Sequence, residues 1–454
     1  MKFDIVIKNG KIVTATHSYF ADVAINGEKI AAIGENLSGR REINAEGMLV
    51  TPGAVDIHVH LEMPIGKFVS TDDFFSGTRA AAFGGTTAIV DFVETQPDET
   101  MLDALAARRA LADARSTIDY GLHMTIAPTD IAKLDQLPAV YDAGCASFKL
   151  YMAYGLRLND GELLQAFQAI RRVGGLPVVH AENWDVITTL IARNLAQGNT
   201  SPHWHPRSRP AELEGEAVGR VIDIAAFAGV PLHIFHVGCQ PAVDRIADAR
   251  RRGLPVTGET CPQYLLLDDT VYDRDGVAGA LPVCAPPIRP RGEQRKIWQA
   301  LADNHLQIVT TDHCPFTVEE KASGLGDFSR IPGGVPAIEM RFPLLYTYGV
   351  RAGFFSENRW VDMACTKPAE MLGFTRKGHI AVGYDADIVV FDPEKTLTIS
   401  PETLHETAGW TPYDGVSVRG MPAVTFSRGQ ILVQNGEFSG KPGHGKFVVR
   451  RLIQ

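Results

Sequence analysis

Short apolar runs alternate with segments of helical periodicity through the middle of the chain. Strand and helix in such regular alternation predict a parallel sheet, and the number of units fits a (β/α)₈ barrel better than an open sheet. The predicted strands lie at residues 86–93, 120–126, 147–152, 176–182, 230–237, 254–260 and 307–313, and the predicted helices include 100–114, 160–174, 214–229 and 241–253.

The two ends of the chain have a different pattern. Apolar and polar residues alternate there, and the alternation is interrupted by Asn-Gly pairs at 9–10, 26–27 and 435–436. This combination is typical of β-hairpins. We therefore predict that residues 1–51 and 378–454 form one small β-rich domain together, and that residues 52–377 form the barrel.

Bulk properties narrow the class of protein. A chain of 454 residues with 45% hydrophobic and 21% charged residues suits a globular barrel with an attached domain. The net charge of −9 argues against a nucleic-acid partner. No apolar run is long enough to cross a membrane, no signal peptide is evident, and the six cysteines lack C-x-x-C spacing. We expect a cytoplasmic protein with reduced cysteines.

Polar residues stand where the predicted strands end. They are the segment "DIHVH" at 56–60, His180, His236, Glu259 and Asp312. The carboxyl ends of all strands in a parallel barrel meet on one face, where active sites lie. These side chains are therefore expected to share one mouth.

Two His-x-His pairs have different expected roles. His58 and His60 are spaced to point to the same side of an extended chain, so they can reach one metal ion or can be an ordinary surface pair. His203 and His205 lie among prolines, which predicts an irregular loop and a structural role. His233 precedes His236 by three residues, faces the opposite side of its strand, and is expected to be structural.

Lys149 interrupts the apolar stretch "SFKLYMAY" at 147–154. A lysine here either extends its charge to solvent or is kept neutral for chemistry. Four histidines and Asp312 exceed the three protein ligands of one catalytic zinc ion, which suggests two metals about 3.5–4 Å apart. A neutral lysine amine can form a carbamate with carbon dioxide and bridge them, so we favour the chemical role.

These segments resemble the hydantoinase and dihydropyrimidinase family of cyclic amidohydrolases over nearly the whole chain. The resemblance lies in "TPGAVDIHVHLEMP", "SFKLYMAY", "VVHAEN", "GETCPQYLLLD" and "TTDHCPF", among others. It implies a (β/α)₈ TIM barrel, a small β-sandwich built from both termini, a homotetramer, and two Zn²⁺ ions bridged by carboxylated Lys149. The implied metal ligands are His58, His60, Lys149, His180, His236 and Asp312.

The resemblance also implies a reaction. Metal-acidified water, with a pKa near about 7, would open the cyclic amide of a 5-substituted hydantoin or a dihydropyrimidine to an N-carbamoyl amino acid. Asp312 would carry the proton, and Tyr154 would stabilise the oxyanion. Ala285 and Gly333, on two loops that bind the ring, replace the serine and asparagine that are usual there. The segment after Tyr154 is shorter than usual, which suggests an altered tolerance for the ring substituent.

Two related activities and one non-enzymatic role are alternatives. Dihydroorotases carry an arginine at the position of Glu62, so an acidic substrate is not expected here. Allantoin is a second candidate, because the loop "GGVPAIE" is similar to that of allantoinases. A non-catalytic scaffold of the same fold would have lost metal ligands, yet every ligand position is filled.

Overall fold

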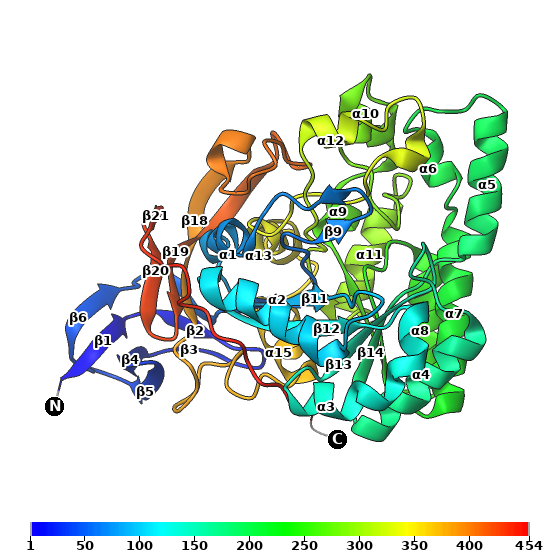
Figure 1. The fold of residues 1–454 in the computed structure, drawn as a ribbon. Helices are drawn as coiled ribbons and strands as arrows, with labels where there is room; N and C mark the ends of the chain where they lie inside the picture. The colour runs from blue at the N-terminus through cyan, green and yellow to red at the C-terminus, as the bar shows by residue number, and fades with distance from the viewer. Residues whose placement is uncertain (1, 453–454) are drawn as a thin grey trace.

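Eight parallel strands form the centre of the computed structural model, which describes residues 2–452 (Figure 1). Each strand pairs with the one before it in the order of the sheet. A parallel bridge between Val59 and His313 connects the first strand to the last, which confirms the predicted (β/α)₈ barrel. The strands are β8 (Ala54–Asp56), β11 (Thr86–Val93), β12 (Asp119–Thr125), β13 (Ser147–Tyr151), β14 (Leu176–His180), β15 (Leu232–Ile234), β16 (Val256–Thr260) and β17 (Ile308–Val309).

Helices surround this sheet (Figure 1). Local sequence signals define both ends of α4. Asn159 and Glu162 form a capping box at its start, and Gly174, at φ 73°, ends it. The other main helices are α1 (Phe74–Phe83), α2 (Met101–Arg115), α3 (Leu137–Asp142), α5 (Trp184–Ala196), α7 (Ala211–Ala228), α8 (Gln240–Arg251), α11 (Glu293–Ala302), α13 (Arg341–Leu345), α14 (Glu357–Val361) and α15 (Lys367–Met371); α4 spans Asp160–Val173.

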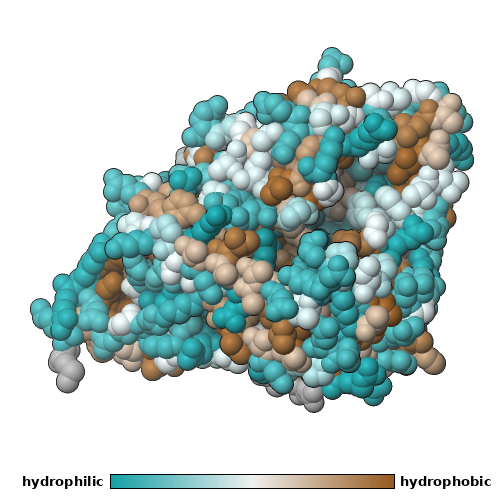
Figure 2. Space-filling view, viewed as in Figure 1, coloured by the Kyte–Doolittle hydropathy of each residue, from teal (hydrophilic) through white to brown (hydrophobic). Residues whose placement is uncertain are grey.

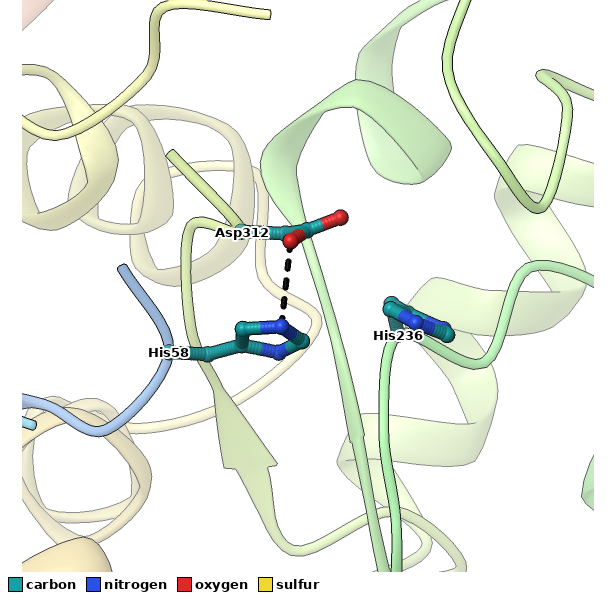
Figure 3. A group of neighbouring side chains, drawn as sticks. All are labelled: His58, His236 and Asp312. Carbon is teal, nitrogen blue, oxygen red and sulfur yellow. Dashed lines mark ion pairs between the residues drawn. The ribbon is translucent and has the colours of Figure 1, made fainter. Parts of the chain in front are cut away.

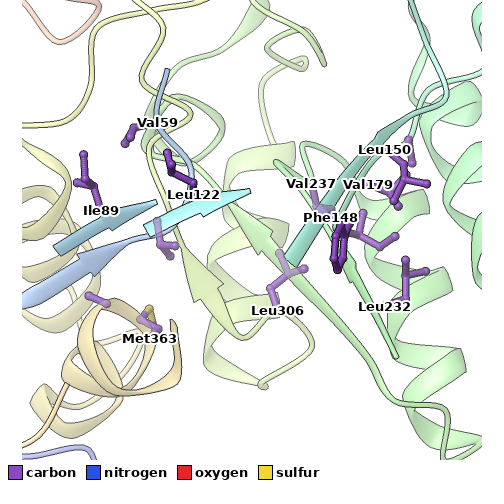
Figure 4. Packing of buried hydrophobic residues seen from close by; sticks show 14 of the residues in the cluster. Val59, Ile89, Leu122, Phe148, Leu150, Val179, Leu232, Val237, Leu306 and Met363 are labelled. Atoms are coloured by element: carbon purple, nitrogen blue, oxygen red, sulfur yellow. The ribbon is translucent and has the colours of Figure 1, made fainter. Parts of the chain in front are cut away.

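Alternation along the barrel strands divides the core in two. On β13, Phe148 and Leu150 pack in the cluster that contains residues of the surrounding helices (Figure 4). Neighbouring positions turn to the barrel interior, where the apolar cluster includes Phe92 and Phe235. Lys149 lies between Phe148 and Leu150 and therefore faces that interior.

Strands from both termini form two further sheets that pack on each other (Figure 1). One has the order β5-β4-β1-β6 and the other β21-β20-β19-β18-β7-β2-β3, with β7 (Leu49–Pro52) antiparallel to β18 (Ile388–Thr398). Both contribute to one apolar core, which confirms a β-sandwich from the two termini, whereas the exact domain boundaries stay a prediction. The remaining bounds are β1 (Phe3–Lys8), β2 (Lys11–Val13), β3 (Ser18–Phe20), β4 (Asp22–Asn26), β5 (Lys29–Gly34), β6 (Gly39–Asn44), β19 (Ser417–Ser427), β20 (Gln430–Gln434) and β21 (Glu437–Phe438).

The surface is mainly hydrophilic, as the composition of a globular protein predicts. Figure 2 shows hydrophilic side chains over most of this face, with hydrophobic residues in separate patches. None of the helices within residues 2–452 has the length and apolar character needed to cross a membrane. All six cysteines are buried with free thiols.

Candidate active site

The carboxyl ends of the barrel strands enclose a cavity of about 660 Å³. All six predicted metal ligands line it, together with Tyr154, Ala285 and Gly333. The rest of the wall is mainly apolar and includes β9 (Pro64–Ile65), which forms a hairpin with β10 (Phe68–Val69). The structure therefore brings together every residue that the sequence singled out for metal or substrate.

His58 and His60 follow β8 and turn towards Asp312, and Figure 3 shows His58 in this arrangement. Their Nε2 atoms lie 3.0 and 3.2 Å from the same oxygen, Oδ1 of Asp312. Burial disfavours the Asp312 carboxylate, but the two histidines outweigh it and hold the carboxyl pKa well below its usual value. Asp312 is thus ionised at neutral pH, with Oδ2 free of hydrogen bonds to the described residues.

His180 and His236 form a second pair at the ends of β14 and β15. Glu182 accepts a hydrogen bond from Nε2 of His180 at 2.8 Å, so Nδ1 carries a lone pair. That Nδ1 lies 2.8 Å from Nε2 of His236, while Nδ1 of His236 is buried and has no hydrogen-bond partner in residues 2–452. Burial lowers the pKa of both histidines, so both rings are neutral.

Lys149 lies between these pairs among aromatic rings. Its Nζ is 4.1 Å from the ring centre of Phe235, 4.6 Å from that of Tyr151 and 5.5 Å from that of Phe92, and the residue is 1% exposed. Solvent access, the alternative for this lysine, is therefore excluded. Burial lowers the pKa of Lys149 to about 7, despite the attraction of Asp312 and Glu259.

Three of the lining residues have an unusual backbone conformation. Tyr154, His236 and Asp312 have φ values of 66°, 38° and 50°. The left-handed region is unfavourable for side chains that carry a Cβ atom, and such strain clusters at functional sites because the fold imposes it. No sequence pattern predicts these conformations.

Glu259 and His233 support the metal-binding side of the cavity. The carboxylate of Glu259 contacts Nδ1 of His58 at 2.6 Å and Nε2 of His233 at 3.0 Å. Burial opposes its ionisation, but the two histidines lower its pKa to about 2. The resulting carboxylate fixes the ring of His58 with Nε2 turned to Asp312. His233 has the expected structural role, but it turns to the barrel interior as His236 does, because the left-handed backbone at His236 interrupts the alternation that the spacing assumed.

Tyr154 belongs to a buried polar group that sequence reasoning missed. Its ring lies 5.4 Å from that of His180, and the guanidinium of Arg209 lies 5.3 Å from the Tyr154 ring centre. Arg209 is paired with Glu182 at 2.6 Å. Burial raises the pKa of Tyr154, so its phenol stays protonated and can donate a hydrogen bond. The only signal for Glu182 was its place two residues after His180.

Lys321 connects the loop of Ala285 to the loop of Gly333 from outside the cavity. Its Nζ donates to the carbonyl oxygens of Val283 and Pro332, each at 2.7 Å, and the residue is fully buried. At Gly333 an added Cβ would lie 3.9 Å from its nearest neighbour, so the backbone tolerates the larger residue that is usual there. Glycine at this position widens the cavity.

Two expectations need correction. Residues 203–207 are not an irregular loop, since they include the short helix α6 (Trp204–Arg207), where His205 contacts the carbonyl oxygen of Cys284 at 2.8 Å. Glu62 does not line the cavity and pairs with Arg115 at 2.7 Å, so it does not repel an acidic substrate directly.

The side chains around the cavity fit a divalent metal site. Ligand atoms of His58, His236 and Asp312 lie within 4.8 Å of one another. Neutral imidazoles and a carboxylate are the donors that such ions prefer, and the unpaired Nδ1 of His236 is a buried nitrogen with a free lone pair. The contacts of Glu182 and Glu259 orient two of the rings, as outer carboxylates commonly do.

Comparisons with known proteins agree with this site. A model of the amidohydrolase family matches residues 49–432. A D-hydantoinase of Geobacillus stearothermophilus is 44% identical over 452 residues, which are 98% of this chain and 96% of that protein. The structure of a D-hydantoinase from Bacillus sp. AR9 is 45% identical with a TM-score of 0.97, covering 99% of this chain and 100% of that one. A dihydropyrimidinase structure from Brevibacillus agri is 44% identical with a TM-score of 0.97, covering 100% of both chains.

The barrel, its mouth and these full-length similarities define an amidohydrolase. More narrowly, the chain belongs to the hydantoinase and dihydropyrimidinase family of cyclic amidohydrolases.

Proposed function

We propose that the protein hydrolyses the cyclic amide bond of 5-substituted hydantoins or dihydropyrimidines and releases N-carbamoyl amino acids. The observation that carries this proposal is the convergence of six potential metal donors, from five barrel strands or the segments that follow them, on one cavity large enough for a small ring. The D-hydantoinases and the dihydropyrimidinase that match over the full chain support the same reaction.

The proposed cofactor is a pair of Zn²⁺ ions held by His58, His60, Lys149, His180, His236 and Asp312. Zinc would polarise the amide carbonyl and supply a strong nucleophile at neutral pH. For Lys149 the proposed form is the carbamate, in which the neutral amine adds to carbon dioxide and loses a proton. Burial of Nζ favours the neutral amine that this addition needs, because the loss of water outweighs the attraction of Asp312 and Glu259 for an ammonium.

The protein residues move the protons. Asp312 is ionised, and its Oδ2 is free to accept a proton from the attacking water and to transfer it to the departing ring nitrogen. The protonated phenol of Tyr154 donates a hydrogen bond to the amide oxygen as negative charge develops there. Ala285 and Gly333 lie on the wall where backbone groups of their loops can bind the ring.

Ring opening by the zinc- and bicarbonate-loaded protein tests the proposal. The substrates are dihydrouracil, both enantiomers of 5-phenylhydantoin, and allantoin, each with a chelated control. We expect metal-dependent turnover of a hydantoin or of dihydrouracil. Turnover of allantoin alone would make the protein an allantoinase, and bound zinc well below two ions per chain without turnover would identify a non-catalytic scaffold.

The oligomeric state and the cellular location of the protein are also proposals. By family resemblance we propose a homotetramer in the cytoplasm that acts on small molecules and not on nucleic acid. Sedimentation equilibrium tests the assembly, for which we expect a mass of four chains.

A further inference from the structure

One carboxylate in the cavity wall has no role in the proposed reaction. Glu94 is the first residue after β11 and lines the cavity at the barrel mouth. The only other carboxylate in the lining is Asp312, which the two histidines engage. Within residues 2–452, the side chain of Glu94 has neither a hydrogen bond nor an ion pair, although it is half-buried.

Two basic side chains in the surroundings of Glu94 are committed to other partners. Arg108, whose charge reaches Glu94, binds Asp91 at 3.0 Å and also the carbonyl oxygen of Leu61. Lys133 donates to three backbone carbonyl oxygens and pairs with Asp130. Burial raises the pKa of Glu94 to about 7, against the opposite effect of Arg108. A half-buried carboxylate without a partner is costly, which is a reason to expect a ligand group beside it.

The position of Glu94 indicates which part of a substrate it meets. The reacting amide must lie against the metal donors and Tyr154, and Ala285 and Gly333 occupy the wall assigned to the ring. The lining that remains includes Met63, Pro64, Ile65, Leu156 and Glu94. We assign these residues to the group that extends from the ring carbon, because the apolar side chains suit an alkyl chain and the carboxylate suits a charged end.

From this arrangement, which rests on the proposed function, we propose that Glu94 selects cyclic amides whose ring substituent ends in a positive charge, such as an aminoalkyl group. The apolar residues of the wall contact the methylene groups, and the carboxylate pairs with the ammonium in a site of restricted water access.

A matched substrate pair tests this assignment. The substrates are 5-(4-aminobutyl)hydantoin and 5-pentylhydantoin, which have similar length and differ in the terminal charge. We expect the zinc-loaded protein to prefer the amine at least tenfold in kcat/KM. In Glu94→Gln this ratio falls at least tenfold. The matched control Asp98→Asn removes the same charge from an exposed position of the same loop and keeps the ratio.

Calorimetric binding of both hydantoins to the same variants separates the two proposals. Turnover of both hydantoins with no preference for the amine, or an equal fall of the ratio in Asp98→Asn, would overturn the role of Glu94 and leave the proposed function intact. Absence of turnover of both hydantoins and of dihydrouracil, with a preference for the amine in binding that Glu94→Gln abolishes, would overturn the proposed function and support Glu94. Equal affinity for both hydantoins in the absence of turnover would overturn both.

Discussion

Within residues 2–452, two clusters of acidic or imidazole side chains have the spacing of metal ligands, but the surroundings of only one of them fit a metal ion. His58, His236 and Asp312 meet at the barrel mouth, whereas Asp119, Asp385 and Asp387 meet between the barrel and the sandwich. Each cluster contains a buried lysine. Lys377 donates to all three aspartates, at 2.7, 3.3 and 2.6 Å, and its ammonium occupies the position that an ion would take.

The pKa values of the two lysines are shifted in opposite directions. Burial lowers the pKa of Lys377, but the three carboxylates outweigh it and raise the pKa above its usual value. Lys149 has aromatic rings in the corresponding positions, and burial prevails. The choice of neighbours therefore decides whether a buried lysine completes a salt-bridge network or offers a reactive amine.

The largest expected effect is the loss of activity and of bound zinc when Lys149 is replaced. Lys149→Met removes the proposed bridging ligand, and a metal contributes several kcal/mol to the transition state, so we expect kcat to fall about 10³-fold or more. Bound zinc, measured by elemental analysis, falls from two ions per chain to one or none. Lys377→Met is the matched control, and it keeps both ions. Full zinc content in Lys149→Met would contradict the bridging role.

Lys377→Met affects stability instead. It leaves three buried aspartates without their shared cation, and loss of one partner from a buried ion pair costs about 3–5 kcal/mol. We expect the free energy of unfolding, measured in urea, to fall by about that amount. Lys446→Met removes an exposed partner of Glu28 near the same junction and should cost about 0–1 kcal/mol. An equally small effect of Lys377→Met would mean that the aspartates bind another cation.

Sequence reasoning identified the barrel and its mouth because both depend on local patterns. The predicted strand at 86–93 is β11, and the predicted helix at 160–174 is α4 with one residue fewer. His180 and Asp312 were found because strand ends in a parallel barrel meet on one face.

Contacts between distant segments could not be predicted in the same way. Lys321 joins carbonyl groups 38 and 11 residues away, and Arg209 pairs with Glu182 across 27 residues. A lysine or arginine in a helical or polar segment gives no sign that it is buried. The left-handed backbone at His236 and Asp312 is imposed by the assembled barrel, so it too is absent from local sequence preference.

Lys321 adds a third case to the comparison. Its pKa is lowered by burial to about 7, as for Lys149, but its Nζ donates to two loop carbonyl groups. Lys321→Met would release the loops of Ala285 and Gly333, and misplacement of a bound substrate by about 1 Å costs up to about 10²-fold. We expect kcat/KM to fall about 10-fold to 10²-fold, mainly through KM, with zinc content unchanged. The exposed Lys296→Met is the control, and equal kinetics of both variants would exclude a positioning role.

Lys149 and Lys377 also differ in the expected pH dependence of stability in the metal-free protein. The folded pKa of Lys149, about 7, lies below the usual value of 10.5, so the unfolded chain binds more protons between these values and stability rises with pH there. Lys149→Met has no amine to titrate at this position, so its stability lacks this dependence on pH. Its unfolding free energy therefore exceeds that of the wild type most at pH 7, and the difference shrinks by at most about 1.4 kcal/mol per pH unit as the pH rises to 10. Lys377 has a raised pKa, so its contribution is fully present below pH 10.5, and the deficit of Lys377→Met stays constant over the same range. Urea titrations of the three proteins at pH 7 to 10 measure both trends, and parallel curves for all three would show that Lys149 is already an ammonium in the folded chain.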